Sequence, residues 1–363
     1  MSLPPSDRRR HPRPGSSSAS SKRGTLTRVT RPRDPFPRTR LTGAFERRVS
    51  RALHTHVVTD APLVVACSGG PDSTATLIAV ARVHAGEVIA ATFDHDMRST
   101  AEAEADRAVV HRVACDLGVP VIEGHAATPP TSEAAARTAR YRWLARTCTK
   151  VGASICVTGH TRDDQAETVL LRLSRGSGAR GVAGMAPSAP WPIAAPSAAS
   201  LRLVRPLLDV ERGEVEAYLA ALGVQAAHDA SNDSSEYARN RVRHDVLPAL
   251  ATVNDQTVLH LAAFAEHQRE DDEALSGWAE AWLNEHGKGS TSTVRVPRKE
   301  LGALPPAVRA RVLTSAAERL GIRLGQAHLE RLGSLISGAG GRVTLAGGIG
   351  EGRGTVFELR RDA

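Results

Sequence analysis

The chain is poor in aromatic residues and cysteine, and it contains no long hydrophobic run. Aromatics make up 3% of its 363 residues, and there are four cysteines. No uncharged apolar segment reaches the ~18 residues of a transmembrane helix, and the basic N-terminus lacks the apolar region of a secretory signal. We therefore expect no membrane partner. No two cysteines form C-x-x-C, which disfavours a zinc site or a disulfide framework and fits a reducing cytoplasm.

Acidic residues are nearly absent from the first 40 positions. This segment holds eleven of the 47 Lys and Arg residues but only Asp7 and Asp34, so the rest of the chain is close to neutral although the net charge is +8. The segment is also rich in Pro and Ser and lacks apolar periodicity, which predicts a disordered basic tail over residues 1–40. Two roles remain open for it, an electrostatic arm for RNA and a solubilising extension.

Strand-like and helix-like segments alternate between residues 62 and 176. The strand-like segments are nearly continuous in apolar residues, which is typical of a parallel sheet covered on both faces. The strands are expected at 62–68, 88–95, 119–125 and 153–160, and the helices at 72–85, 99–118, 132–152 and 163–176. The pattern predicts an α/β fold with a doubly wound, mostly parallel sheet.

A second unit is expected after a boundary near residue 250. Residues 251–285 have a helical pattern, and residues 292–321 are interpreted as a second helical hairpin. Apolar residues alternate within 341–361, which predicts a β-hairpin. The expected division is a tail at 1–40, a catalytic domain at 41–250, and a helical linker with a smaller C-terminal α+β domain at 251–363.

The stretch SGGPDS interrupts the boundary between the first strand and its helix. Its residues are Ser68, Gly69, Gly70, Pro71, Asp72 and Ser73. The glycines allow backbone N–H groups to turn toward one point, and the helix that follows adds its positive end, so the stretch suits a phosphate group. The lysine of a Walker A loop is absent. An acid beside phosphates indicates a bridging Mg²⁺, whereas the plainer alternative is an ordinary tight turn.

Further polar clusters follow the other strands, and parallel strands should bring them to one rim of the sheet. Residues Asp94, His95 and Arg98 follow the second strand, and Gly159, His160, Asp163, Asp164 and Glu167 follow the fourth. Glu133, Arg137, Arg140 and Tyr141 share one face of the helix between them. For these clusters the alternatives are a structural histidine, a helix N-terminus rich in acids, and a solvated salt-bridged face, respectively.

A glycine-rich basic loop follows the fourth helix. Residues 176–181 match G-x-G-x-x-G, but they follow a helix rather than a strand, so a dinucleotide site is rejected. Arg172, Arg175 and Arg180 instead make the loop suitable for an RNA backbone. The residue types in the polar stretch 229–250 do not by themselves predict a function.

Seven stretches in this order resemble the tRNA(Ile)-lysidine synthetases, a family of N-type ATP pyrophosphatases. They are S-G-G-x-D-S at 68–73, D-H-x-x-R at 94–98, E-x-x-x-R-x-x-R-Y at 133–141, G-H-x-x-D-D-x-x-E-T at 159–168, L-R-x-x-R-G-S-G at 171–178, R-P-L-L at 205–208 and D-x-S-N with R-N-x-x-R-x-x-x-x-P at 229–248. The sequence departs from the family at Asp96 and Met97, where Gly-Leu is usual, and it leaves no room for the extra C-terminal domain of larger members.

The resemblance implies an adenine nucleotide alpha hydrolase-like, Rossmann-type fold and a two-step ligation. ATP would adenylate the C2 oxygen of the wobble cytidine in a tRNA(Ile) with a CAU anticodon, and free L-lysine would then displace AMP. Some members are homodimers, and nothing in this sequence decides the point.

The resemblance also implies roles for individual residues. ATP would bind Ser68 to Ser73 with Asp94, His95, Gly159 and His160, and Mg²⁺ would bind Asp72, Asp163 and Asp164. Arg137 and Arg140 would hold phosphate or RNA, and Glu167 would bind or deprotonate the lysine amine. The implied tRNA-binding residues are Arg98, Arg172, Arg175, Arg180, Arg239, Asn240 and Arg243.

Three other functions would use a similar loop. A tRNA thiolating enzyme is the main alternative, although such enzymes generally need paired cysteines or an iron–sulfur cluster. An ammonia-dependent ligase would share only the first motif. A non-catalytic tRNA-binding protein would be expected to lack Asp72 or the pair Asp163 and Asp164.

Overall fold

The structure is a computed structural model that describes residues 34–57, 60–95, 100–193, 198, 200–227 and 238–362. Expectations for Arg98, for residues 1–33 and for the stretch 229–237 therefore lie outside the described residues. Within these ranges, no helix has both the length and the apolar character that crossing a bilayer requires.

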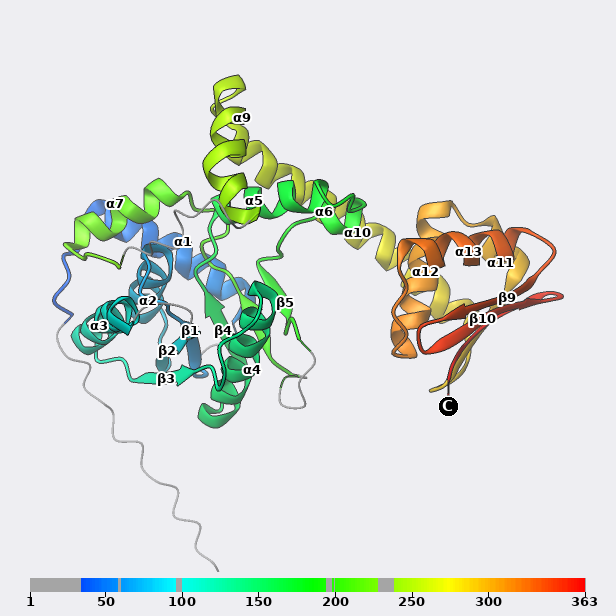
Figure 1. Ribbon diagram of the computed structural model, residues 1–363, viewed down its shortest axis with the longest axis horizontal. Coiled ribbons are helices and arrows are strands. Elements are labelled where there is room, and N and C mark those ends of the chain that lie inside the picture. The colour runs from blue at the N-terminus through cyan, green and yellow to red at the C-terminus, as the bar shows by residue number, and fades with distance from the viewer. Residues whose placement is uncertain are drawn as a thin grey trace, which may run out of the picture.

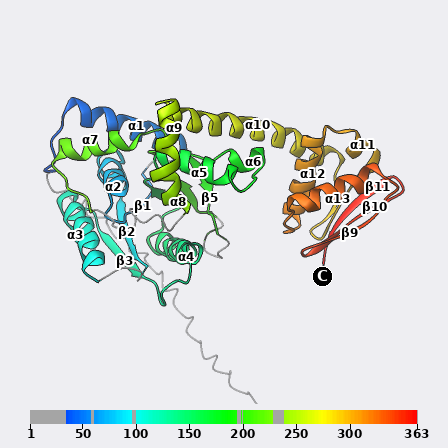
Figure 2. The ribbon, with the colours of Figure 1, turned by 45° about the horizontal axis from the view of Figure 1, so that its top comes forward.

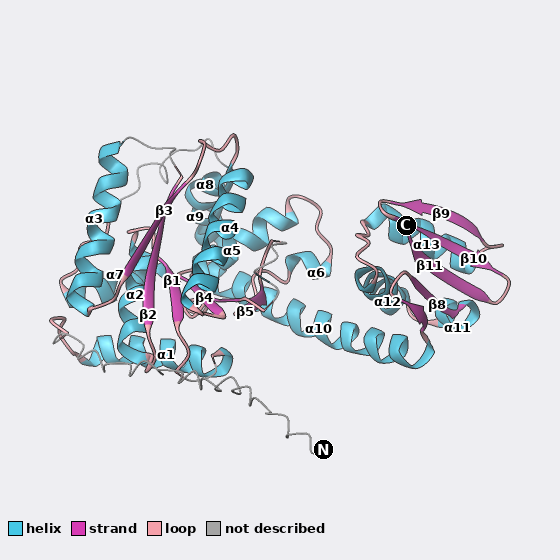
Figure 3. Ribbon diagram, turned by 90° about the horizontal axis from the view of Figure 1, so that it is seen from below, coloured by secondary structure: helices cyan, strands magenta, loops and turns pink. Residues whose placement is uncertain are grey.

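The N-terminal unit is built on a six-stranded sheet in the order β3-β2-β1-β4-β6-β5 (Figure 3). All neighbours are parallel except β5 and β6, which are antiparallel, so the predicted mostly parallel α/β sheet is confirmed. The strands are β1 Leu63–Ala66, β2 Val88–Asp94, β3 Val121–His125, β4 Ile155–Thr158, β5 Ser188–Pro190 and β6 Arg202–Val204. The last two strands were not predicted, because each has only three residues.

Helices cover both faces of this sheet, because the side chains of β1 alternate between two apolar layers. Leu63 and Val65 pack in one layer with helices α1 Arg40–His56, α2 Pro71–Val83, α3 Thr100–Leu117 and α7 Arg212–Leu222. Val64 packs in the other layer with α4 Glu133–Val151. Burial of β1 on both faces leaves only its carboxyl end open for chemistry.

A helical arm leads from this unit to the C-terminal unit. It begins with α8 Ala238–Arg241, the π-helix η3 Val242–Val246 and α9 Leu247–Val253, and it continues as the long helix α10 Thr257–His286. At one end α10 packs on α5 Arg162–Leu173 and α6 Ala179–Val182, and at the other on α12 Pro306–Arg319 (Figures 1 and 2). The arm thus belongs to both units.

The C-terminal unit is an antiparallel sheet packed against helices. The strands are β7 Lys288–Ser290, β8 Thr293–Pro297, β9 Gly341–Leu345, β10 Gly348–Arg353 and β11 Val356–Arg361, in the order β7-β8-β11-β10-β9. The helices are α11 Arg298–Ala303, α12 and α13 Gln326–Ser337. Their core includes Leu283, Leu313 and Phe357.

Two expectations for the C-terminal unit are corrected. The expected helical hairpin at 292–321 begins with strand β8, because Val294 and Val296 alternate with polar residues at a period of two. The expected hairpin at 341–361 is a three-stranded meander, in which Gly347 and Gly354 have positive φ angles of 88° and 55° at its two turns.

A buried ion network fixes the start of the described chain. Arg82 on α2, whose side chain is 1% exposed, donates to both oxygens of Asp34 at 2.8 and 3.1 Å. It also donates to Glu46 on α1 at 2.6 Å, and Tyr218 on α7 donates to the same carboxylate. Residues 34–39 therefore contact the folded body, and the expectation of disorder up to residue 40 does not hold for them.

Replacing Arg82 with methionine should strongly destabilise the protein, because the buried Glu46 loses its counter-charge. Breaking one partner of a buried ion pair costs roughly 3–5 kcal/mol. Urea unfolding of Arg82→Met should show a loss of this size, whereas Arg51→Met, an exposed position on α1, should change stability by less than about 0.5 kcal/mol. Equal losses in the two variants would contradict the buried network.

Candidate active site

The loop after β1 is shaped by a glycine that no other residue could replace without strain. Gly69 has a φ of +91°, and a Cβ atom there would lie 2.6 Å from the carbonyl oxygen of Asp106. Ser73 Oγ accepts from the backbone N–H of Ser68 at 3.1 Å and donates to Gly70 O at 3.0 Å, which closes the loop on itself. The hydroxyl of Ser68 lies 3.2 Å from that of Ser73. Two hydroxyls therefore meet beside the start of α2.

The first turn of α2 has no side-chain cap. Gly70 is the N-cap residue and Pro71 follows it, so no side chain accepts from the N–H groups of this turn. Such a turn favours an anion through its dipole and its backbone donors. Gly159 at the end of β4 lies so close that a Cβ atom would be 2.6 Å from Asp72 O. The ends of β1 and β4 are thus held together around the loop.

Asp72 is a carboxylate without adequate compensation. Its Oδ1 is buried and has no hydrogen-bond partner, and its Oδ2 lies 3.9 Å from Arg212 Nη2. Burial and the nearby Asp164 raise the pKa of Asp72 to about 7. Asp163 lies nearby on α5, where its Oδ2 accepts from the backbone N–H of Arg212 at 2.9 Å. A cation would relieve this arrangement.

The other two predicted acidic residues are already paired. Asp164 accepts from Thr161 N at 2.8 Å as part of a capping box and from Arg239 Nη2 at 2.8 Å. Glu167 is fully buried, and its two oxygens accept from Arg243 Nε at 2.6 Å and Arg239 Nε at 2.7 Å. Burial would raise the pKa of Asp164, but Arg239 leads the groups that hold it below its ordinary value.

These pairings bear on the expected roles of several residues. Both oxygens of Glu167 are engaged by arginines, which disfavours it as the base for a lysine amine. Arg239 and Arg243 pair with the carboxylates of Asp164 and Glu167, and Asn240 between them is buried. The described residues also hold no group of three His, Cys, Asp or Glu side chains that could bind a metal ion by themselves.

A magnesium ion nevertheless fits beside Asp72. Mg²⁺ is commonly held by one or two carboxylates together with substrate phosphates rather than by an all-protein cage. The unpartnered Oδ1 of Asp72 and the neighbouring Asp163 supply such carboxylates next to the loop Ser68–Ser73. The oxygens of Asp164 are bonded to Thr161 and Arg239, so Asp164 would add negative charge near the ion without being a ligand.

The remaining residues of the predicted nucleotide site lie at the same rim. Asp94 ends β2, and the ring of His95 packs edge-on against Phe93. His160 follows β4, and its Nδ1 lies 2.9 Å from the hydroxyl of Thr158. Burial, with neighbouring arginines, lowers the pKa of His160 to about 3, so this imidazole is neutral at pH 7.

Four of the predicted cationic residues lie on α4, α5 and α6. Arg137 and Arg140 both lie over the ring of Tyr141, at 4.9 and 5.5 Å from its centre. Arg172 donates to the carbonyls of Gly181 and Gly184, so it holds the glycine-rich loop in place. Arg175 is exposed, and Arg180 forms an exposed pair with Glu318 of the C-terminal unit.

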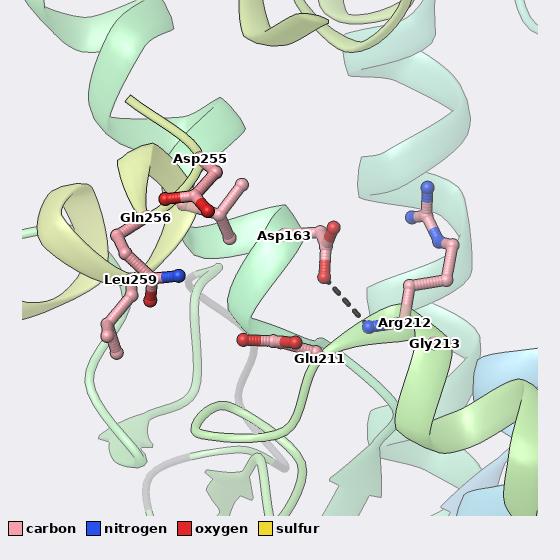
Figure 4. Close-up of a pocket in the computed structure, with 8 residues that line it drawn as sticks. Asp163, Glu211, Arg212, Gly213, Asp255, Gln256 and Leu259 are labelled. Carbon is pink, nitrogen blue, oxygen red and sulfur yellow. Dashed lines mark hydrogen bonds between the residues drawn. The ribbon is translucent and has the colours of Figure 1, made fainter. Parts of the chain in front are cut away.

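A cavity of about 220 Å³ opens beside Asp163 (Figure 4). Its lining residues are Asp163, Glu211, Arg212, Gly213, Asp255, Gln256, Val258 and Leu259. They come from the starts of α5, α7 and α10, which places the carboxylates of Asp163, Glu211 and Asp255 around one space, whereas the side chain of Arg212 extends away from it. The cavity is far larger than the ~10–15 Å³ that one water molecule needs.

Sequence reasoning missed two arginines of this rim. Arg212 approaches Asp72 but stands in no motif, so nothing in the sequence pointed to it. Arg205 is the first residue of R-P-L-L. The motif does not reveal that this arginine is buried, with an exposed fraction of 7%.

Comparison with known proteins places this site in a family. The PP-loop domain model matches residues 41–250, and the TilS substrate binding domain model matches residues 297–361. A tRNA(Ile)-lysidine synthase of Salinispora arenicola is 40% identical over 84% of this chain and 92% of its own length. The corresponding protein of Thermobifida fusca is 38% identical over 75% of this chain and 82% of its own length.

The chain belongs to the tRNA(Ile)-lysidine synthase family. Among solved structures, a U34-tRNA thiolase of Methanococcus maripaludis with its [4Fe-4S] cluster has a TM-score of 0.51 and 14% identity, covering 63% of this chain and 79% of that chain. This likeness shows a shared fold. The family assignment rests on the sequence matches and on both domain models.

The cysteines of this family member give no support to sulfur chemistry. Cys67, Cys148 and Cys156 are buried and only Cys115 is exposed. Cys148 and Cys156 pack in the apolar layer between α4 and the sheet. The hydrogen bond with Cys148, together with burial, raises the pKa of the Cys156 thiol well above its ordinary value, which suppresses the reactive thiolate.

Replacing Asp72 with asparagine should stabilise the ligand-free protein at alkaline pH. A carboxyl whose pKa rises from 3.8 to about 7 on folding stabilises at low pH and loses that contribution as pH rises through this window. Urea unfolding without nucleotide or Mg²⁺ should therefore show Asp72→Asn more stable than wild type by about 1–3 kcal/mol at pH 8, and no more stable at pH 4. The exposed Asp271→Asn serves as control. A variant less stable than wild type at pH 8 would contradict the charge strain at Asp72.

Proposed function

We propose that this protein ligates free L-lysine to C2 of the wobble cytidine of a CAU-anticodon tRNA(Ile), forming lysidine. The observation that carries the proposal is the uncapped loop Ser68–Ser73 with the uncompensated carboxylate of Asp72 beside it. A loop of this kind takes the pyrophosphate part of ATP, and the family assignment indicates the tRNA and the amino acid. Such an enzyme acts in the cytoplasm, where the three substrates meet.

In the first step the C2 oxygen of cytidine attacks the α-phosphorus of ATP, and the bond to pyrophosphate breaks. The loop donors and the start of α2 stabilise the leaving pyrophosphate through N–H and O–H groups that are already in place. Asp72 and Asp163 would hold Mg²⁺, which would neutralise charge on the phosphates. Arg212 adds a fixed positive charge beside them.

In the second step the lysine amine attacks C2, and AMP leaves with the oxygen. The adenylate makes a poor leaving group into a good one, and the amine must lose a proton to become nucleophilic. Glu167 serves in this scheme as the anchor for Arg239 and Arg243, since both its oxygens are engaged. It thereby positions α8 and η3 against α5.

The cavity beside Asp163 is the proposed lysine pocket. Free lysine carries two ammonium groups, and the cavity offers the carboxylates of Asp163, Asp255 and Glu211, of which Glu211 also pairs with Arg162. Asp163 also lies near Asp72, so an amine held there is close to the proposed phosphate site. Asp255 then supplies selectivity for the cationic amino acid.

The reaction itself is the first test. Purified protein is incubated with ATP, Mg²⁺, radiolabelled lysine and transcripts of tRNA(Ile) and tRNA(Met), both with CAU anticodons. Label should enter only the tRNA(Ile). Asp72→Ala should lower the rate by roughly a hundredfold, and Asp271→Ala should leave it unchanged.

An outcome without lysine incorporation would reject the ligase. If ATP is bound and pyrophosphate is released in a tRNA-dependent way without lysine, a different nucleophile uses the same adenylating site. Sulfur transfer to the same tRNA would be measured next.

The lysine pocket has its own test. Asp255→Asn should raise the KM for lysine about tenfold or more, because one charge partner of the ammonium is lost, and it should leave the KM for ATP unchanged. Glu266→Gln, an exposed change further along α10, is the matched control. An unchanged KM for lysine in Asp255→Asn would place the amino acid elsewhere.

A further inference from the structure

Four arginines gather at the rim without an acidic partner. Arg137 and Arg140 lie on α4, Arg172 lies on α5, and Arg205 directly follows β6. In the part of the chain that the structure describes, none of the four forms an ion pair with a carboxylate. Burial, together with Arg137 and Arg172, lowers the pKa of Arg205. Four positive charges so close together repel one another, and a bound anion would relieve that repulsion.

Arg205 is the most buried member of this group. It is 7% exposed, its Nη1 donates to the carbonyl of Ala186 at 2.6 Å, and its Nε is buried without a hydrogen-bond partner. A buried guanidinium that uses only part of its fork is costly unless a ligand completes it. Its neighbour Arg202, at the opposite end of β6, is exposed and bonds Ser188 instead.

The other unused donors of the group lie around one aromatic ring. Tyr141 is 1% exposed, and its hydroxyl has no partner. Arg140, whose Nε is also buried without a partner, and Arg137 both lie over this ring. Tyr141 and Arg205 interact electrostatically, so the three unpartnered groups belong to one site. Three separate donors suit a ligand with several oxygens.

This site differs from the loop that follows β1. The loop is at the end of β1, whereas Arg205 is at the end of β6, and β4 lies between these strands. Arg140 and Arg205 both act on His160 at the end of β4. The two anion sites therefore stand on either side of His160, along the same rim.

We propose that Arg205, Arg137, Arg140 and Tyr141 form a second phosphate site, which binds a backbone phosphate of the tRNA next to the reacting nucleotide. The proposal rests on the proposed function for the identity of the RNA, but the phosphate chemistry stands on the geometry alone. Arg172 is a positioning residue here, because it holds the loop carbonyls and adds positive charge. The other source of the same chemistry is a phosphate of ATP.

Binding measurements on the full chain separate these sources. The affinity for a tRNA(Ile) transcript is measured against salt concentration for wild type, Arg205→Gln and the control Arg202→Gln, which loses the same charge from the same strand. Loss of one phosphate contact should lower the magnitude of the slope of log affinity against log salt concentration by about 0.7–0.9. Arg205→Gln should show this change and bind roughly tenfold more weakly at low salt, whereas Arg202→Gln should behave as wild type.

ATP affinity without tRNA is the second arm. An unchanged ATP affinity together with a lowered tRNA slope in Arg205→Gln assigns the site to the RNA, and a loss of ATP affinity of tenfold or more with an unchanged tRNA slope assigns it to ATP. If neither changes, or if Arg202→Gln changes equally, the phosphate site is overturned. Lysine is absent from both assays, so failure of the ligase reaction would not affect their reading.

Two further variants guard against misfolding of Arg205→Gln. Thermal unfolding checks each protein. Arg137→Gln changes an exposed position that should fold normally and should lower the slope by a similar amount. Arg205→Lys keeps the charge but not the planar fork, so it should restore the slope more than the affinity. A slope unchanged in both Arg137→Gln and Arg205→Gln would overturn the proposal.

Discussion

The arrangement of the rim depends on one fully buried carboxylate. Glu167 is out of reach of water, so it must be neutralised by protein cations, and Arg239 and Arg243 supply that charge from a segment far along the chain. Their pairing fixes α8 and η3 on α5. Because η3 leads into α9 and then α10, the same contact sets where the long helix begins, and with it the wall of the cavity at Asp255.

The π-helix fits this explanation. The π-helix η3 follows α8, which contains Arg239, and η3 itself contains Arg243; both guanidiniums pair with Glu167. Such turns are rare and often occur at functional sites. A regular helix would rotate the residues that follow, including Leu247, which packs against α5 in a small apolar cluster of its own. The ion cluster and the apolar contact thus require the same irregularity.

Periodicity in the sequence was enough to predict the central sheet, since four of its strands are continuous apolar runs and parallel strands share one edge. It also predicted that Asp72, His160 and Asp163 would meet there. It could not predict partners that lie 72 to 79 residues apart, such as Arg239 with Glu167 and Arg243 with Asp164. Strands β5 and β6 were not predicted, because three residues are too few to show an alternating pattern. Strand β8 was assigned to a helix, because a helical pattern follows it directly.

In the proposed function, opposite charge excesses at the two sides of the rim let one site serve three differently charged substrates. The side of Asp72 and Asp163 carries negative charge that repels phosphates until a cation joins them, and the same charge attracts an ammonium group to the neighbouring cavity. The side of Arg137 and Arg205 carries positive charge that attracts phosphate and repels that ammonium. His160 stands between them as a neutral ring, because burial, together with the neighbouring arginines, lowers its pKa. The proposed sites for phosphate and for the ammonium group therefore differ in charge, and only the reacting atoms need to meet between them.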